Sequence, residues 1–193
     1  MAESTRQQIV DAADDLFYGQ GFAQTSFADI AAAVKISRGN FYYHFKTKDE
    51  ILDAVIDKRL ADREALLAKW DETAAGPVDR IACFVKIVIV NQSRIMAFGC
   101  PVGTLTTELF KLGHPSAGKA NRIMALFRDW LVRQFEALGC GDRSTDQALH
   151  VLGWSQGVAT LSQAFKDEAH VEREVRRILA WLDDVAGSPS AVQ

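Results

Sequence analysis

Hydrophobic residues recur at helical spacing along most of this chain of 193 residues. From residue 27 to 34, the apolar positions Phe27, Ile30, Ala31 and Val34 follow the i, i+3, i+4, i+7 spacing of one buried helical face. Beyond residue 47 the period stays helical, and no segment alternates convincingly as a strand would. The pattern therefore predicts an all-α protein of about nine helices.

Glycine and proline mark the breaks between the predicted helices. The apolar run from Ile81 to Val90 resembles a buried strand, but its length and its context favour a helix that begins at Pro77. Ser144 and Gln147 have the spacing of a capping box at a later helix start. The predicted helices are an initial one before Gly21, residues 27–34, 38–45, a long one from Thr47 to the break at 74–77, then 77–90, 105–112, 116–138, 145–165 and 171–185.

Residues 25–48 predict two short helices joined by a tight turn. Thr25 or Ser26 is suited to cap the first helix and Ser37 the second, because a side-chain hydroxyl accepts an orphan backbone N–H. In the second helix Phe41 and Phe45 share one face, which anchors the helix and leaves the opposite face free. That opposite face is centred on Gly39, Asn40 and Tyr43, flanked by Arg38, Tyr42 and His44.

The second short helix has the size and the side chains of a DNA-reading element. Eight or nine residues rise roughly 12 to 14 Å, which is comparable to the ~12 Å width of the B-DNA major groove. The next helix begins with Thr47-x-x-Glu50, a spacing that predicts a capping box. The exposed N–H groups of this helix start, beside Lys46 and Lys48, are suited to bind a phosphate. The candidate DNA-binding residues are Thr25, Lys35, Ser37, Arg38, Gly39, Asn40, Tyr42, Tyr43, His44, Lys46 and Lys48.

Charge changes this picture only locally. The whole chain has a net charge of -3 and an isoelectric point of about 5.8, which is not typical of a nucleic-acid binder. Between Ile30 and Lys48, however, there are four basic residues and no acidic one, whereas aspartates and glutamates crowd the flanks. We therefore expect few phosphate contacts per subunit and weak non-specific affinity.

One set of residues between positions 6 and 56 has a recognisable spacing, namely Ile9, Ala12, Ala13, Leu16, Phe17, Gly21, Phe22, Thr25, Ile30, Ala31, Ile36, Ser37, Gly39, Phe41, Tyr42, Phe45, Lys48 and Leu52. With this pattern the N-terminal region resembles the TetR (tetracycline repressor) family of bacterial transcriptional regulators. One departure is Lys35, which occupies the turn position where the family usually has glycine, so that either the turn is reshaped or about 1 kcal/mol of strain is tolerated.

The resemblance implies a helix-turn-helix DNA-binding domain at residues 1–47 and an effector-binding and dimerisation domain at residues 48–193. It implies a non-enzymatic repressor that binds a palindromic double-stranded operator as a homodimer, has no cofactor and is released by a small organic effector. A dimer also makes physical sense, because one recognition helix reads too few base pairs. In similar proteins the last two helices pair with those of a second subunit, which suggests Val151, Ser155, Val158, Ser162, Ile178 and Leu182 as interface residues.

The segment Gly99-Cys100-Pro101-Val102-Gly103 looks like the G-C-x-x-G element of a TetR subgroup whose members tend to respond to small organic effectors or electrophiles. A thiol-based electrophile or redox sensor acting through Cys100 is therefore an alternative on the same scaffold, since backbone N–H groups at a helix boundary can lower a thiol pKa. The effector-pocket candidates are Phe98, Cys100, Leu105, Glu108, Phe127, Trp130 and Trp154.

Other chemistries have little support. Cys83, Cys100 and Cys140 have no C-x-x-C spacing, which argues against a disulfide framework or a zinc site, and Cys140 reads as an exposed turn residue. The histidines form no H-x-x-x-H pair, so no metal site is expected. A remote alternative is a thiol enzyme with Cys100 as nucleophile, His114 as base and Glu108 as orienter. The N-terminus lacks an apolar leader and no long uncharged apolar run occurs, so we expect a cytoplasmic protein.

Overall fold

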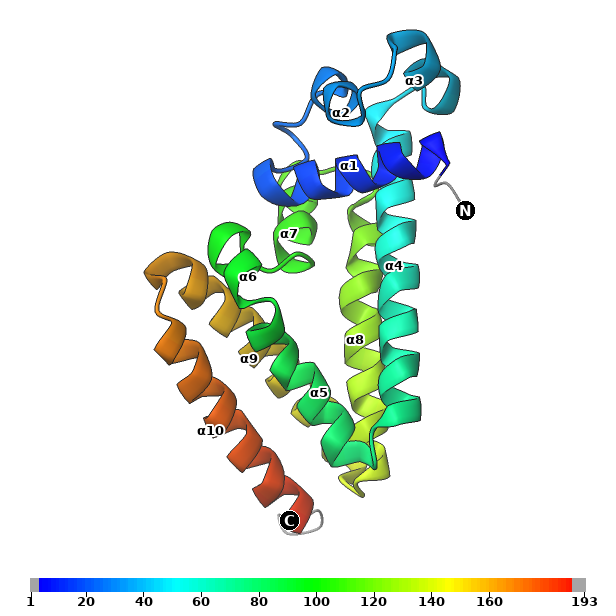
Figure 1. Cartoon of the computed structure of the whole chain (residues 1–193). Helices are drawn as coiled ribbons and strands as arrows, with labels where there is room; N and C mark the ends of the chain where they lie inside the picture. The colour runs from blue at the N-terminus through cyan, green and yellow to red at the C-terminus, as the bar shows by residue number, and fades with distance from the viewer. Residues whose placement is uncertain (1–3, 189–193) are drawn as a thin grey trace. The chain divides into compact units, whose positions relative to one another are not determined.

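The computed structural model describes residues 4–188, apart from the side chain of Arg38. These residues form α-helices and one short 3-10 helix, with no strand among them, so the predicted all-α class is confirmed (Figure 1). One helix, α6, has no counterpart in the sequence-based prediction. The elements are α1 (Thr5–Gln20), α2 (Phe27–Val34), α3 (Arg38–His44), α4 (Lys48–Thr73), α5 (Pro77–Val90), α6 (Gln92–Phe98), α7 (Gly103–Lys111), α8 (Ala117–Ala137), η1 (Gly141–Arg143), α9 (Ser144–Phe165) and α10 (Glu168–Gly187).

Side-chain caps explain where several helices begin. Ser26 caps α2, because its hydroxyl accepts the N–H of Asp29 at 3.2 Å, and its own N–H donates to the Asp29 carboxylate at 2.8 Å, which completes a capping box. The hydrogen bonds from the Ser26 hydroxyl and then from its N–H lower the pKa of Asp29. The predicted box at Ser144 and Gln147 is wrong, because Arg143 is the N-cap of α9 and the buried Ser144 hydroxyl has no partner among the described residues.

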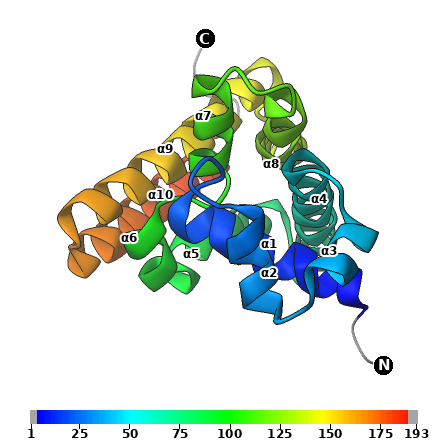
Figure 2. The same cartoon turned by 90° about the horizontal axis from the view of Figure 1, so that it is seen from above.

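The chain divides into two compact units, which are residues 1–63 with 101–123, and residues 64–100 with 124–193. Helix α4 contributes to both, since residue 63 ends its part in the first unit. In the first unit α1 contacts α2 and also α7 (Figures 1 and 2). Its core is apolar and fully buried at Ile9, Ile30, Phe41, Ile51 and Leu52. The functional boundary expected between residues 47 and 48 stays a prediction.

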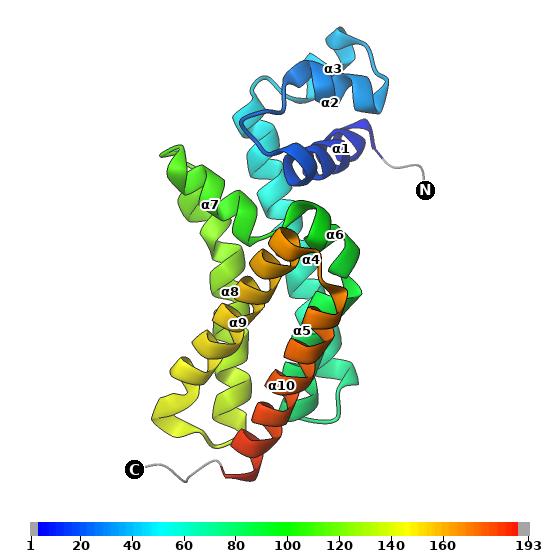
Figure 3. The same cartoon turned by 90° about the vertical axis from the view of Figure 1, so that its left-hand side faces the viewer.

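In the second unit α10 packs against α5 and α9, and α9 also packs against α6 (Figure 3). Helix α5 carries the buried side chains of Ile81 and Val85, so the apolar run is a helix as predicted. The indole of Trp130 in α8 is fully buried, and its N–H lies 3.1 Å from both carboxylate oxygens of Asp71. That bond satisfies a polar group that would otherwise be costly to bury.

Of the described helices, none is by itself long and apolar enough to cross a membrane. The pair formed by residues 77–90 and 92–111, bent by 59°, meets the criterion of length and composition only when its two parts are joined.

Candidate nucleic-acid interface

Helices α2 and α3 form a helix-turn-helix whose turn passes through a left-handed residue. Lys35 has φ 58° and ψ 39°, and its N–H donates to the carbonyl of Ala32. The turn is therefore not reshaped, and the lysine adopts the conformation that glycine would adopt with less strain. Ser37 then starts α3, because its hydroxyl accepts the N–H of Asn40 at 3.3 Å.

The two faces of α3 are divided as the sequence predicts. Phe41 and Phe45 are 1% and 2% exposed, and Phe41 packs edge-on against Phe27 of α2 with ring centres 5.2 Å apart. Asn40 is exposed, and Tyr43 is 79% exposed. Since α3 is anchored by its two phenylalanines, its outward side chains are presented from a fixed backbone.

Tyr42 and His44 flank that outward face and have partners within the unit. The Tyr42 ring stacks on Phe27 at 5.7 Å with an interplanar angle of 13°, although half of the tyrosine remains exposed. His44 meets the ring of Tyr43 edge-on at 5.2 Å. These contacts hold the two flanking side chains beside the outward face of α3. The side chain of Arg38 is outside the described part of the structure.

The lysines next to α3 are not equivalent. Lys35 is exposed, and Lys46 is exposed with its ammonium donating to the carbonyl of Tyr42. Lys48 turns inward instead, since its ammonium donates to the carbonyls of Phe22 and Thr25 at 2.9 and 3.0 Å. This placement differs from the expected phosphate contact and gives Lys48 a structural role.

Thr25 also departs from its expected role. It is 1% exposed, and its hydroxyl donates to the carbonyl of Gly21 at 2.7 Å and accepts from the amide of Gln20 at 3.2 Å. A buried hydroxyl with both capacities in use is not available to a phosphate. Because Thr25 precedes the Ser26 cap, it fixes the entry to α2.

The capping box at the start of α4 is only half formed. Thr47 accepts the N–H of Glu50 at 3.1 Å, as predicted. The Glu50 carboxylate, however, accepts the N–H of Lys46 at 2.7 Å instead of that of Thr47. The carboxylate thereby places a negative charge next to the expected phosphate-binding site. That charge would repel a phosphate bound there.

One basic residue beside α3 was missed from the sequence. The Arg6 guanidinium, on the exposed first turn of α1, lies over the Phe45 ring with 4.8 Å between its Cζ atom and the ring centre. A cation–π contact between residues so far apart in the chain leaves no periodic signal in a sequence. The only available hint was a basic residue at the start of the initial helix.

The effector-pocket candidates lie in both compact units. Leu105 and Glu108 belong to the first unit, and Phe98, Cys100, Phe127, Trp130 and Trp154 to the second. Two of them have structural partners that argue against a role in contacting an effector. Trp130 is fully buried on Asp71, and Glu108 accepts the N–H groups of Phe22 and Ala23.

The other candidates differ in exposure. Phe98 is 39% exposed, Leu105 is buried, and Phe127 packs against Phe84 at 5.4 Å. Trp154 is half-buried, and its indole N–H is buried without a hydrogen-bond partner among the described residues. An unpaired buried donor is costly, which makes Trp154 the candidate most in need of a partner.

The thiols and the proposed catalytic trio are arranged differently from the expectations. Cys140 is buried, not exposed, and burial raises the pKa of its thiol. Cys83 and Cys100 are half-buried. His114 accepts the N–H of Ser116 at its Nδ1, and Glu108 is engaged elsewhere, so neither is set as base or orienter for a nucleophile. Among residues 4–188 no cluster of three or more metal-ligating side chains is placed to hold an ion.

The protomer itself buries all of the expected dimer-interface residues, so a single copy presents little of their surface to a partner. They lie on the inward faces of α9 and α10, and are Val151, Ser155, Val158, Ser162, Ile178 and Leu182. An exposed stripe of α9 is instead made of residues that are apolar or lack a side chain, namely Leu149, Gly153, Gly157, Leu161 and Phe165. These five recur every four positions, and we call them the α9 outer face. The periodic stripe found in the sequence is the core-facing side of these helices, and its role in a dimer stays a prediction.

Comparison with known proteins agrees with this geometry. Residues 9–55 match the sequence model of the family described as bacterial regulatory proteins, tetR family. The HTH-type transcriptional regulator TtgR of Pseudomonas putida is 38% identical over 88 residues, which cover 46% of this chain and 41% of TtgR. The HTH-type transcriptional repressor DhaR of a Mycobacterium species is 25% identical over 127 residues, which cover 65% of this chain and 61% of DhaR. The chain thus spans less than two thirds of the length of these relatives.

Solved structures extend the likeness to the helical remainder of the chain. The crystal structure of a TetR transcriptional regulator from Legionella pneumophila has a TM-score of 0.82 and 22% identity, and the match covers 93% of this chain and 97% of that one. At this identity the comparison concerns the fold. Residues 9–55 thus match the sequence model of the tetR family of bacterial regulatory proteins, and the helical remainder shares its fold with the Legionella structure.

Proposed function

We propose that this protein is a DNA-binding transcriptional regulator that represses its targets by occupying a palindromic operator as a homodimer. The observation that carries the proposal is α3, a short helix anchored by Phe41 and Phe45 that presents Asn40 and Tyr43 to solvent. Donor-bearing side chains on an exposed, anchored helix suit the major groove. A regulator of this kind acts on chromosomal DNA, and hence in the bacterial cytoplasm.

The direct test of DNA binding uses selection, because the operator is unknown. The purified protein is mixed with a random-sequence duplex library, and the bound fraction is sequenced over several rounds. We expect enrichment of an inverted repeat with half-sites about one helical turn apart. Enrichment of no sequence, or of a single half-site, would contradict the proposal.

A second copy of the chain is the proposed occupant of the α9 outer face. An added Cβ at Gly153 or Gly157 would meet no atom within 4 Å, so both glycines leave open space in a single protomer. Leu161 and Phe165 continue this face and are 41% and 73% exposed. Small residues between large apolar ones allow two helices to approach closely, as a twofold interface requires.

The charges of α10 support the same occupant. Two exposed arginines, Arg176 and Arg177, precede the exposed Ala180, and two exposed aspartates, Asp183 and Asp184, follow it. A twofold axis near Ala180 would set the arginines of one α10 against the aspartates of an antiparallel partner. Such an arrangement is self-complementary, which favours a closed dimer over an open chain of subunits.

Effector release is proposed to act through α4. This helix begins at Lys48, next to the DNA-reading helix, and its residues 64–73 belong to the second unit. An effector that prefers one position of α4 would shift the population toward recognition helices at the wrong separation. The unpaired indole N–H of Trp154 favours an effector that offers a hydrogen-bond acceptor. An effector that bound tightly without changing operator affinity would argue against this mechanism.

The thiol sensor is a separate, less favoured alternative that needs its own experiment. Wild-type protein and Cys100→Ser are bound to the selected duplex and treated with N-ethylmaleimide. Faster release of wild type than of the variant would support the sensor. Equal release would exclude a role for Cys100.

A further inference from the structure

The segment 101–123 belongs to the helix-turn-helix unit, although the chain before and after it belongs to the second unit. The chain therefore passes from one unit to the other at residues 100/101 and again at 123/124. Movement of the second unit pulls directly on this segment through the peptide bonds. The side chains that attach the segment to α1 then decide whether such movement reaches the DNA-reading helices.

Glu108 in α7 makes the first attachment. Its Oε2 accepts the N–H of Phe22 at 3.0 Å, and its Oε1 accepts the N–H of Ala23 at 2.9 Å. Both amides lie in the turn that joins α1 to α2. The turn permits this approach because Gly21, with φ 92°, carries no Cβ; an added one would lie 3.1 Å from Glu108 Oε1. Two charge-assisted bonds to adjacent amides hold the turn in position and in orientation.

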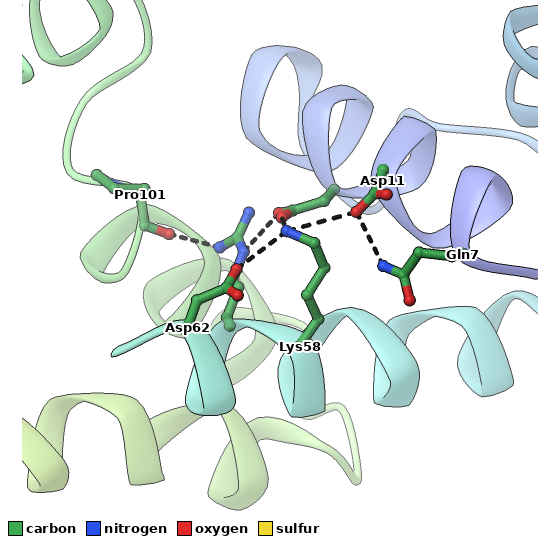
Figure 4. A network of polar contacts seen from close by, with 7 residues as sticks. Gln7, Asp11, Lys58, Asp62 and Pro101 are labelled. Atoms are coloured by element: carbon green, nitrogen blue, oxygen red, sulfur yellow. Dashed lines mark hydrogen bonds and ion pairs between the residues drawn. The ribbon is translucent and has the colours of Figure 1, made fainter. Parts of the chain in front are cut away.

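Arg59 in α4 makes the second attachment, within the polar network that includes Lys58 and Pro101 (Figure 4). It is 4% exposed, its Nε donates to Asp14 of α1 at 2.7 Å, and its Nη1 donates to the carbonyl oxygen of Pro101 at 2.6 Å. Lys58 lies 3.3 Å from the second oxygen of Asp14 and 3.5 Å from Asp11. A buried guanidinium that loses either acceptor keeps an unpaired donor, so Arg59 resists separation of Pro101 from α1.

We propose that Glu108 and Arg59 are positioning residues that form one two-point attachment, through which segment 101–108 sets the position of α1 and of the helix-turn-helix for operator binding. The two points reach α1 at Asp14 and the turn immediately after α1 at Phe22. Attachment at two separated points transmits rotation as well as translation, which one contact does not. The inference rests on the proposed DNA-binding function. It adds to α4 a second connection, through segment 101–108, between the second unit and the DNA-binding helices.

The test uses the full-length protein and a duplex selected from a random library by the wild type. Glu108→Gln keeps the shape of the side chain but sets an amide NH2 against one of the two N–H donors. Arg59→Lys keeps the charge but lacks the fork that reaches two acceptors. Glu136→Gln, at an exposed carboxylate of α8, is the matched control. Circular dichroism establishes that each variant is folded at the assay temperature.

We expect Glu108→Gln and Arg59→Lys each to weaken duplex binding about tenfold, within the usual range of coupling between sites. The double variant is expected to lose about tenfold and not about a hundredfold, because changes to one linkage are not additive. In Glu108→Gln the amide proton resonances of Phe22 and Ala23 move upfield without DNA. The control is expected to bind as wild type.

Two results would overturn the inference alone. One is unchanged duplex affinity in Glu108→Gln although the Phe22 and Ala23 resonances have moved, and the other is a double variant whose losses multiply. A wild-type protein that selects no duplex would instead overturn the proposed function. That failure is distinguishable, because it appears before any substitution is made.

Discussion

The ammonium group of Lys48 lies 2.9 Å from the carbonyl oxygen of Phe22 and 4.3 Å from the centre of the Phe22 ring. Lys48 therefore joins the start of α4 to the turn before α2, and its charge is directed into the protein. The nearby Lys46 has its charge at the surface. The two lysines are close in sequence but have opposite expected effects when substituted.

Lys46→Met is expected to reduce the salt dependence of operator binding, and Lys48→Met is not. Each lost phosphate contact lowers the slope of log K against log salt by about 0.9, so a dimer loses about 2. Lys48→Met removes the side-chain hydrogen bonds to two carbonyls, of which that of Phe22 still accepts the N–H of Thr25, and is expected to lower the free energy of unfolding by about 1 to 2 kcal/mol. Salt titrations of duplex binding and urea unfolding distinguish the two. A reduced salt slope in Lys48→Met would instead show that Lys48 contacts a phosphate.

Tyr43→Ala is expected to weaken operator binding without destabilising the protein. Tyr43 is 79% exposed, so its removal changes the free energy of unfolding by less than about 0.5 kcal/mol. Loss of a base-facing side chain typically costs about 1 to 3 kcal/mol of binding. The matched variant is Tyr42→Ala, which removes a stack on Phe27 and is expected to lower stability by about 0.5 to 1.5 kcal/mol. Full operator affinity in Tyr43→Ala would show that this tyrosine does not contact the bases.

Lys35→Gly is expected to be more stable than Lys35→Ala by about 1 kcal/mol, because only glycine adopts a left-handed conformation without strain. The observed φ of 58° is the reason. The same pair of substitutions at Lys166, whose φ is 55°, is a control outside the DNA-binding unit. Thermal unfolding measures both differences. Equal stability of the two Lys35 variants would mean that the turn changes its conformation in solution.

Gly157→Leu is expected to break the dimer while leaving the protomer folded. Nothing lies within 4 Å of the added Cβ, and replacing a glycine inside a helix favours that helix by up to about 1 kcal/mol. Sedimentation equilibrium reports the monomer–dimer constant. Val158→Ala, which is buried inside the protomer, is expected to lower stability and to leave the dimer intact. A dimer that persists in Gly157→Leu would show that the interface does not lie on the α9 outer face.

The local pattern of the sequence was sufficient for the α-helices other than α6 and for the two faces of α3. Apolar residues at a period of 3.6 define a buried stripe whatever it packs against, and caps such as Ser26 and Ser37 act on amides three residues away. Such interactions are short in sequence, so they are visible in it. The fold class and the anchoring role of Phe41 and Phe45 were predictable for this reason.

Tertiary structure alone decided which members of these patterns remain available for function. Lys48 and Thr25 looked like phosphate contacts until distant carbonyls and the burial of Thr25 gave them other partners. Glu108 looked like a pocket residue, yet it binds amides far earlier in the chain, at Phe22 and Ala23. A charged or polar side chain is satisfied by whatever the fold brings near it, and sequence spacing does not encode that neighbour. The sequence therefore determined where helices form and which stripes are apolar, and the packing determined which polar groups remain to meet DNA.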